Sequence, residues 1–259
     1  MHFFKYQGAG NDFILLDNRI GEIRLTAPQI QKLCDRRLGI GADGLMLLNT
    51  STEADFQMSY FNADGNPGSL CGNGSRCMIR FAHDLGIRKT RYDFLASDGL
   101  HQAEILPDGN IRLQMHDVNR LEATDQGFFL DTGSPHVVRV VNDLEKLDVD
   151  QVGRSIRHHP LFAPGGTNVN FLQRTSDPGQ IRVRTFERGV EAETLSCGTG
   201  VTACALVLAQ LDQTIRETHI HTAGGDLRVS YQTNDFEQFR DIWLMGPAKR
   251  VFEGEIELT

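Results

Sequence analysis

Two cysteines in this chain of 259 residues occupy matching positions, each between a glycine-containing loop and an apolar helix pattern. Cys71 begins the sequence C-G-N-G and Cys197 begins C-G-T-G. A cysteine at a helix N-terminus faces unpaired backbone N–H groups and the positive end of the helix dipole, which favour the thiolate. The same N–H groups bind carboxylates and phosphates. Each motif therefore predicts a reactive sulfur beside an anion site.

Two such sites can together invert a carbon centre. If the sulfurs lie on opposite sides of a bound molecule, one thiolate removes a proton from carbon and the opposite thiol delivers another. A carboxylate held at the helix N-termini would stabilise the negative charge that develops in the transition state. We therefore expect a two-thiol stereoinversion with no cofactor and no metal. Sulfurs in this arrangement would also join as a disulfide on oxidation, with reversible loss of activity.

The remaining cysteines and one glycine motif have simpler interpretations. Cys34, Cys77 and Cys204 fall on helix faces that we expect to be buried, where cysteine behaves as a small hydrophobic residue. Residues 8–13 begin like the G-x-G-x-x-G dinucleotide fingerprint but end in Phe, so nucleotide binding is not expected.

Several charged or titratable residues are weaker candidates. His219 and His221 share one face of a predicted strand without a third ligand at a recognisable spacing, which favours a surface pair over a metal site. His136 precedes a Val-rich strand and fits a turn residue and an acid–base group equally well. Glu187 and Arg188 lie in the loop before Cys197, where an exposed ion pair is the simplest interpretation.

The elements that position the two cysteines form an internal repeat. Residues 61–74 and 186–200 each contain the end of a strand at Phe, a polar loop and C-G-x-G, and an apolar helix follows. The cysteines are 126 residues apart, close to half the chain, which indicates duplication. We expect one copy per domain, with domains at residues 1–117 and 118–248.

Periodicity predicts helices and many short strands. The helices cover residues 26–39, with a capping box at the start, 75–85, 150–158 and 201–211. A turn at residues 107–110 predicts an antiparallel hairpin. The predicted strands are residues 2–6, 13–17, 45–48, 56–61, 111–115, 137–141, 169–172, 181–186, 227–231 and 242–245.

Composition argues against several classes of function. Lys and Arg number 26 against 34 Asp and Glu, a net charge of -8 without a basic run, so neither nucleic acid nor an anionic membrane is an expected partner. Apolar stretches fall far short of the roughly 20 residues of a membrane span, and the N-terminal sequence lacks a signal-peptide pattern. Five cysteines are too few, and odd in number, for a disulfide framework. We expect a cytoplasmic protein that binds a small molecule.

Six segments resemble the diaminopimelate epimerase family in order and spacing, within a resemblance that covers nearly the whole chain. They are KYQGAGNDFILLD, RRLGIGADG, FNADGNPGSLCGNGSRC, TGSPHVV, GTNVNF and FERGVEAETLSCGTGVTAC. The resemblance implies a cofactor-independent isomerase that interconverts LL- and meso-2,6-diaminopimelate, in lysine and peptidoglycan precursor biosynthesis.

The resemblance also implies the architecture. The family fold is α+β, with two pseudo-symmetric domains, each a mixed β-sheet rolled around a central α-helix, and an active site in the interdomain cleft. The last strand, about residues 249–259, would return to the first domain. A homodimer is compatible with the resemblance.

By the same resemblance, Cys71 and Cys197 are the acid–base pair that acts on the α-carbon from opposite faces. Backbone groups directly after each cysteine would hold the α-carboxylate, Arg188 would bind the distal carboxylate through its planar fork, and Glu187 would pair with an ammonium group. His136 would assist by polarising or orienting the reacting centre. The family's substrate contacts correspond to Asn11, Asn62, Gly72, Asn73, Asn168, Glu187, Arg188, Gly198 and Thr199.

Two positions depart from the family pattern, and other activities stay open. Many members have Gln where Gly44 stands and Asn where Ser134 stands. Ser134 still donates and accepts hydrogen bonds at a shorter reach, whereas Gly44 cannot. The alternatives are a proline or hydroxyproline racemase on the same architecture, an isomerase of the phenazine-biosynthesis type, which generally lacks the cysteine pair, and a non-catalytic small-molecule or metal-binding protein.

Overall fold

The computed structural model describes residues 1–68 and 70–257, and the chain divides into two compact units. Unit 1 comprises Met1–Leu113 and Gly246–Thr259, and unit 2 comprises Gln114–Met245. The predicted domain boundary, after residue 117, lies close to this division. The end of the predicted last strand, residues 258 and 259, lies outside the described residues.

Unit 1 is a mixed sheet with two helices, α1 (Ala27–Cys34) and α2 (Gly72–Asp84). Neighbouring strands are hydrogen-bonded in the order β17–β1–β2–β3–β4–β5–β6–β7, with parallel pairs at β2–β3 and β4–β5 and antiparallel pairs elsewhere. The strands are β1 (His2–Gly8), β2 (Asn11–Asp17), β3 (Gly44–Asn49), β4 (Phe56–Asn62), β5 (Arg91–Ala96), β6 (Gly99–Ile105), β7 (Ile111–Gln114) and β17 (Lys249–Glu255).

Unit 2 has helices α3 (Val149–Arg157) and α4 (Gly198–Leu211) and a short 3-10 turn at Pro160–Phe162. Its strands follow the order β8–β9–β10–β11–β12–β14–β15–β16, with parallel pairs at β10–β11 and β12–β14, and β13 also pairs with β12. The strands are β8 (Leu121–Thr124), β9 (Gly127–Asp131), β10 (Pro135–Val140), β11 (Asn168–Arg174), β12 (Gln180–Glu187), β13 (Ala192–Thr194), β14 (Glu217–Thr222), β15 (Gly225–Gln232) and β16 (Arg240–Gly246).

The two units repeat one topology. Read along the two strand orders, the succession of parallel and antiparallel pairs is identical. Each unit also has one helix between equivalent strands: α2 lies between β4 and β5 in the chain, and α4 follows β12 and β13 and precedes β14. The strand equivalent to β8 is supplied in unit 1 by β17, from the far end of the chain. This repetition is what the 126-residue spacing of the cysteine motifs predicts, and the α+β fold class is confirmed.

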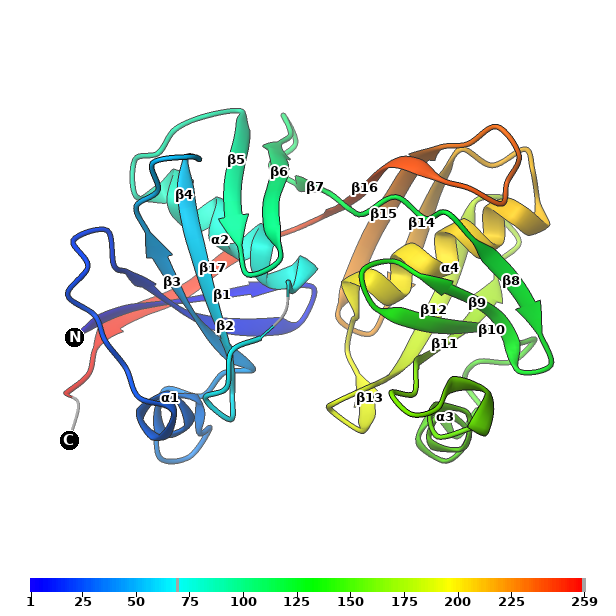
Figure 1. The fold of residues 1–259 in the computed structure, drawn as a ribbon, viewed down its shortest axis with the longest axis horizontal. Helices are drawn as coiled ribbons and strands as arrows, with labels where there is room; N and C mark the ends of the chain where they lie inside the picture. The colour runs from blue at the N-terminus through cyan, green and yellow to red at the C-terminus, as the bar shows by residue number, and fades with distance from the viewer. Residues whose placement is uncertain (69, 258–259) are drawn as a thin grey trace. The chain divides into compact units, whose positions relative to one another are not determined.

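Each unit packs its sheet around one helix, α2 or α4 (Figure 1). Helix α2 contacts β1, β2, β3, β6 and β17, and α4 contacts β9, β10, β11, β12, β14 and β15. Side chains alternate across a strand: Ile14 and Leu16 of β2 pack with Ile30 and Leu33 of α1, whereas Phe13 lies against the start of α2. The C-G-x-G motifs therefore begin the helices that form the core of each unit.

All four predicted helices are present, with different ends. Helices α2 and α4 begin directly after their cysteines, three residues earlier than predicted, because tertiary packing of the first turn outweighs the low helix propensity of glycine. The Gln29 side chain accepts the Thr26 backbone N–H at 2.9 Å, as the predicted capping box requires. The predicted end of α1 near residue 39 was wrong, since the Asp35 carboxylate accepts the next backbone N–H groups and closes a turn there.

The ten predicted strands and the hairpin at residues 107–110 are confirmed, the hairpin joining β6 to β7. The strand prediction missed β5, β6, β8, β9, β13 and β14. In the described part of the chain, no helix is both long enough and apolar enough to span a membrane.

Candidate active site

The first half-site is the group of predicted residues around Cys71 in unit 1. Cys71 is the N-cap of α2 and is partly exposed. Its Sγ accepts the backbone N–H of Gly74 at 3.4 Å, and its S–H donates to Asn11 Oδ1 at 3.6 Å. Asn11 Nδ2 donates to the Asp43 carboxylate at 2.5 Å, so the amide is oriented with its oxygen toward the sulfur. The sulfur thus has one contact that favours the thiolate and one that favours the thiol.

A cluster of four charged residues fixes the strand that carries Asn11. The Asp12 carboxylate forms ion pairs with Lys5 Nζ at 2.7 Å and with Arg36 Nη2 at 2.7 Å. Arg36 Nη2 also lies 2.7 Å from the Asp43 carboxylate. Burial alone would raise the pKa of Asp12, but the hydrogen bonds and charges of Arg36 and Lys5 outweigh it and lower that pKa to about 2. The carboxylates that orient the half-site are therefore held in charged pairs.

Asn62 lies at the end of β4, directly before the loop that leads to Cys71, and is exposed. It pairs with Gly44 across β3 and β4. A Cβ at position 44 would lie 2.6 Å from the Phe61 carbonyl oxygen and 2.6 Å from the Tyr60 ring. In this chain the Tyr60 ring therefore occupies the space into which a side chain at position 44 would extend.

The second half-site surrounds Cys197 in unit 2. Cys197 is the N-cap of α4 and is 7% exposed. Its Sγ lies 3.5 Å from Thr199 Oγ1, and either atom can be the donor. Thr132 Oγ1 donates to the Thr199 carbonyl at 3.0 Å, which ties the first turn of α4 to the end of β9. Gly198 is buried in the same turn.

His136 is fully buried beside the start of α4. Asn170 Nδ2 donates to His136 Nδ1 at 3.0 Å and to the Val137 carbonyl at 3.2 Å, and Asn170 Oδ1 accepts from Thr185 at 3.0 Å. A Cβ at Gly200 would lie 2.2 Å from Asn170 Oδ1, so only glycine fits at this position of α4. Since Nδ1 accepts, the assigned tautomer carries its proton on Nε2, which is buried without a hydrogen-bond partner among the described residues. Burial, aided by the Arg188 charge, lowers the pKa of His136 to about 3.

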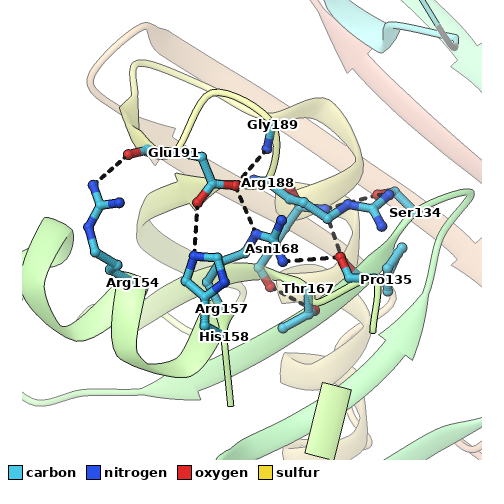
Figure 2. A network of polar contacts seen from close by, with 11 residues as sticks. Ser134, Pro135, Arg154, Arg157, His158, Thr167, Asn168, Arg188, Gly189 and Glu191 are labelled. Atoms are coloured by element: carbon cyan, nitrogen blue, oxygen red, sulfur yellow. Dashed lines mark hydrogen bonds and ion pairs between the residues drawn. The ribbon is translucent and has the colours of Figure 1, made fainter. Parts of the chain in front are cut away.

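Asn168 and Arg188 converge on Ser134 (Figure 2). Asn168 Nδ2 donates to Ser134 Oγ at 2.9 Å and to the Pro135 carbonyl at 3.0 Å, and its Oδ1 accepts the Arg188 backbone N–H at 2.9 Å. In the part of the chain that the structure covers, the Arg188 guanidinium makes one hydrogen bond, 3.4 Å to Ser134 Oγ. The amide of Asn168 thus holds Arg188 and Ser134 in place, while most of the Arg188 donors remain available for a ligand.

Glu191 anchors the loop that carries Glu187 and Arg188 to helix α3 (Figure 2). Its carboxylate accepts the Gly189 N–H at 3.1 Å and Arg157 Nε at 3.0 Å, and it lies 3.2 Å from His158 Nε2. The Glu191 backbone has φ 59°, a left-handed conformation that is costly without glycine. Glu187 accepts from Thr194 Oγ1 at 2.9 Å at the other side of the loop. This loop is therefore held by side chains rather than by strand pairing alone.

The sequence analysis identified most residues of both half-sites but missed three that support them. Asn170 could have been noticed as a lone polar residue in an apolar strand pattern, and Glu191 as the second of three acidic residues in the repeat loop. Arg76, buried in α2, occupies the same position in its repeat as Thr202 in the other. Among the described residues, no three His, Cys, Asp or Glu side chains form a group that could hold a metal.

The chain matches the family model described as Diaminopimelate epimerase over residues 3–121 and 128–251. It is 48% identical to a diaminopimelate epimerase of Flavobacterium psychrophilum, with 99% of this chain and 100% of the relative covered. It is 46% identical to the same-named protein of Chlorobaculum tepidum, with 97% and 99% covered.

Solved structures with much lower sequence identity share the fold. A PhzF-family phenazine biosynthesis protein of Bacillus anthracis is similar with a TM-score of 0.77 at 16% identity, covering 99% of both chains. A probable proline racemase of Agrobacterium radiobacter is similar with a TM-score of 0.68 at 16% identity, covering 100% of this chain and 93% of that one.

Proposed function

Because the chain belongs to the diaminopimelate epimerase family, we propose that it interconverts LL- and meso-2,6-diaminopimelate with Cys71 and Cys197 as its two acid–base groups. The family assignment makes it an isomerase that acts on a small molecule. The observation that carries the two-cysteine mechanism is that each cysteine is the N-cap residue of the central helix in one of two units with the same strand topology. The solved proline racemase shares only the fold, so a proline or hydroxyproline substrate becomes an outcome of the test below.

The proposed reaction is a proton exchange at one α-carbon. The thiolate of one cysteine takes the α-proton, so that an S–H bond forms while the C–H bond breaks and its electron pair moves onto the α-carbon and carboxylate. The thiol of the other cysteine then gives its proton to the opposite face. The two cysteines have exchanged protonation states at the end of a turnover, and the reverse reaction starts from the new state.

Substrate binding in this proposal uses the groups that surround each sulfur. The N–H groups after Cys71 and Cys197, at Gly72, Asn73, Gly198 and Thr199, hold the α-carboxylate and stabilise the charge that develops on it. The available donors of Arg188 bind the distal carboxylate, and Glu187 pairs with an ammonium group. Asn11 and Asn62 contact the substrate from unit 1. Asn168 acts by holding Arg188, and His136 acts as a neutral imidazole because its charged form is suppressed by burial.

Exchange of the α-proton with solvent tests the proposal. LL-diaminopimelate incubated with the protein in D2O, without pyridoxal phosphate, should acquire deuterium at an α-carbon, measured by NMR or mass spectrometry. Epimerisation should fall at least about a hundredfold in Cys71→Ala and in Cys197→Ala, because each face needs its own acid–base group. Cys204→Ala is the matched control, since this thiol is buried inside α4, and it should retain activity.

A panel of amino acids separates the alternatives. Exchange into proline or hydroxyproline but not diaminopimelate would replace the proposed substrate, and full activity in either single cysteine variant would contradict the two-thiol mechanism. A homodimer and a cytoplasmic location stay predictions from the sequence, and light scattering on the purified protein measures the first of them.

A further inference from the structure

Arg76 is a fully buried cation in the first half of α2. Its guanidinium donates to the Gly72 carbonyl at 3.2 Å, to Asn73 Oδ1 at 2.8 Å and to the Pro247 carbonyl at 3.5 Å. All three acceptors are neutral, and no carboxylate in the described part of the chain pairs with it. Burial lowers the pKa of Arg76 to about 10, which leaves the side chain charged at neutral pH. A buried charge without a counter-ion is costly, which points to an anion that forms or binds nearby.

The internal repeat provides a comparison for this residue. Arg76 lies five residues after Cys71, and Thr202 lies five residues after Cys197. Thr202 Oγ1 donates to the Gly198 carbonyl at 2.9 Å, the counterpart of the Gly72 carbonyl that Arg76 contacts. The equivalent carbonyl of the first helical turn thus accepts a hydrogen bond in both copies, from a cation in one and from a neutral hydroxyl in the other. The half-sites are alike in shape and different in charge.

Most other charged groups on α2 and on the elements packed against it have a partner. Arg80 donates to the Gly109 carbonyl at 2.7 Å, His83 Nδ1 lies 2.8 Å from the Tyr92 hydroxyl, Asp17 pairs with Arg19 and His2 lies near Glu253, while Lys249 and Glu255 are exposed on β17. Asn11 Oδ1 favours the thiol of Cys71 and the Gly74 N–H favours its thiolate, while the Cys77 thiol has its pKa raised by burial. The charge and hydrogen-bond pairs are Lys5 and Arg36 with Asp12 and Asp43, Tyr6 with Asp84, His101 with Asp98, Arg112 with Glu104, and Arg250 with Glu253. Among the described residues, Arg76 therefore contributes a fully buried positive charge that is held by neutral acceptors in the first half of the helix.

We propose that Arg76 is a positioning residue of the first half-site, which fixes the Gly72–Asn73 turn for an anionic ligand and keeps the thiolate form of Cys71 accessible. A cysteine that alternates between acid and base needs both protonation states within reach. At Cys197 the Thr199 hydroxyl can donate or accept and so serves both states. At Cys71 the amide oxygen of Asn11 only accepts, and the Arg76 charge offsets it. The identification of the anionic ligand as a substrate carboxylate rests on the proposed function. The effect of Arg76 on the protonation of Cys71 does not.

The pH dependence of alkylation tests the proposal without using turnover. Iodoacetamide reacts with thiolates, and peptide mapping by mass spectrometry reports Cys71 and Cys197 separately in one sample. Arg76→Met keeps an unbranched apolar stem and removes the charged guanidinium. In Arg76→Met we expect the pH midpoint of the Cys71 alkylation rate to rise by about one unit, and the Cys71 rate at pH 7 to fall about tenfold. The pH midpoint for Cys197 should be unchanged.

Three further variants make the result decisive. Arg76→Lys should restore Cys71 alkylation, because the positive charge returns. Its KM for diaminopimelate should be higher than that of the unaltered protein, because lysine lacks the planar fork that holds the Gly72–Asn73 turn. Thr202→Val, at the matched position, should leave Cys71 alkylation unaltered. Arg76→Gln replaces Arg76→Met if the latter does not fold by circular dichroism, and if neither folds, Arg76→Lys must keep the Cys71 midpoint.

The proposal is overturned by an unchanged Cys71 midpoint in a folded neutral variant, by equal shifts at both cysteines, or by a shifted midpoint in Arg76→Lys. A protein that alkylates as expected but does not turn over diaminopimelate would contradict the proposed function and leave the effect of Arg76 on Cys71 standing.

Discussion

The two sulfurs have chemically different neighbours although their sequence motifs are nearly the same. Cys71 lies between an amide oxygen and a backbone N–H, and Cys197 lies beside the hydroxyl of Thr199. In each case one protein group can accept from the thiol, and in each case a donor is available to the thiolate. Single residues near each motif therefore adjust a common helix-terminus environment to a sulfur that, in the proposed reaction, both takes and gives a proton.

His136 gives a prediction about stability and pH. Its pKa is about 3 in the folded protein and about 6.5 in an unfolded chain. Between these values the unfolded chain binds a proton that the folded protein does not, so the free energy of unfolding should decrease as pH falls from about 6.5 toward 3. Urea denaturation at several pH values measures the slope, which should flatten in His136→Gln. His219→Gln is the control because His219 is exposed, and equal slopes in all three proteins would contradict the prediction.

At the scale of elements, each half-site combines a helix start with a loop that other elements hold. The first turn of α4 is tied to β9 through Thr132, and the first turn of α2 is held by Arg76. The loop after β12 is held by Glu191, through contacts to α3 that include Arg157. Helix starts in the core are fixed by packing, whereas the loop depends on a few polar contacts and is the more easily disturbed part.

Glu191→Gln should loosen the loop that presents Arg188. The change removes the charge that pairs with Arg157 and His158, so Arg188 would be held less well in the position where we propose that it binds the distal carboxylate. We expect the KM for diaminopimelate to rise about three- to tenfold with a smaller change in kcat, as for a lost binding interaction. Steady-state kinetics measure both. Glu145→Gln, which removes an exposed ion pair with Arg182, should change neither, and a loss confined to kcat would assign Glu191 a different role.

At the scale of the whole molecule, two copies of one topology each provide a sulfur, and the C-terminal strand β17 completes the sheet of unit 1. The arrangement resembles a duplication in which the first strand of the N-terminal copy is supplied by β17, from the C-terminal end of the chain. Since the N-terminal unit includes the C-terminal segment, a truncation before β17 would expose the edge of β1 and remove a strand that contacts α2.

The proposed reaction requires both sulfurs to reach one α-carbon, and oxidation tests this requirement. An oxidant such as diamide, which accepts two electrons and two protons from a pair of thiols, should join Cys71 to Cys197 and abolish epimerisation, and dithiothreitol should restore it. Mass spectrometry of non-reduced peptides identifies the bond. Substrate present during oxidation should protect the thiols. Activity that is indifferent to reductant after oxidation, with no linked peptide, would contradict the close approach of the two sulfurs.

The sequence alone determined the features that depend on neighbours along the chain. The capping box at Thr26, the apolar strands and the C-G-x-G motifs are local patterns, and the repeat is visible because both copies kept their cysteine and glycines. These patterns singled out the two cysteines as candidates, and the resemblance of six segments to one family supplied the fold class. Strands with mixed polarity, such as β5 and β14, were missed because their burial depends on partners that periodicity does not reveal.

Tertiary structure decided which polar residues support the half-sites. Arg76 meets Pro247 from the opposite end of the chain, His136 meets Asn170 from 34 residues away, and Glu191 meets Arg157 across the same separation. Nothing in a local pattern distinguishes a buried arginine of this kind from a solvated one. The cost of burying a polar group and the contacts that offset it arise only when distant segments pack together, and that packing is what makes two similar motifs chemically unequal.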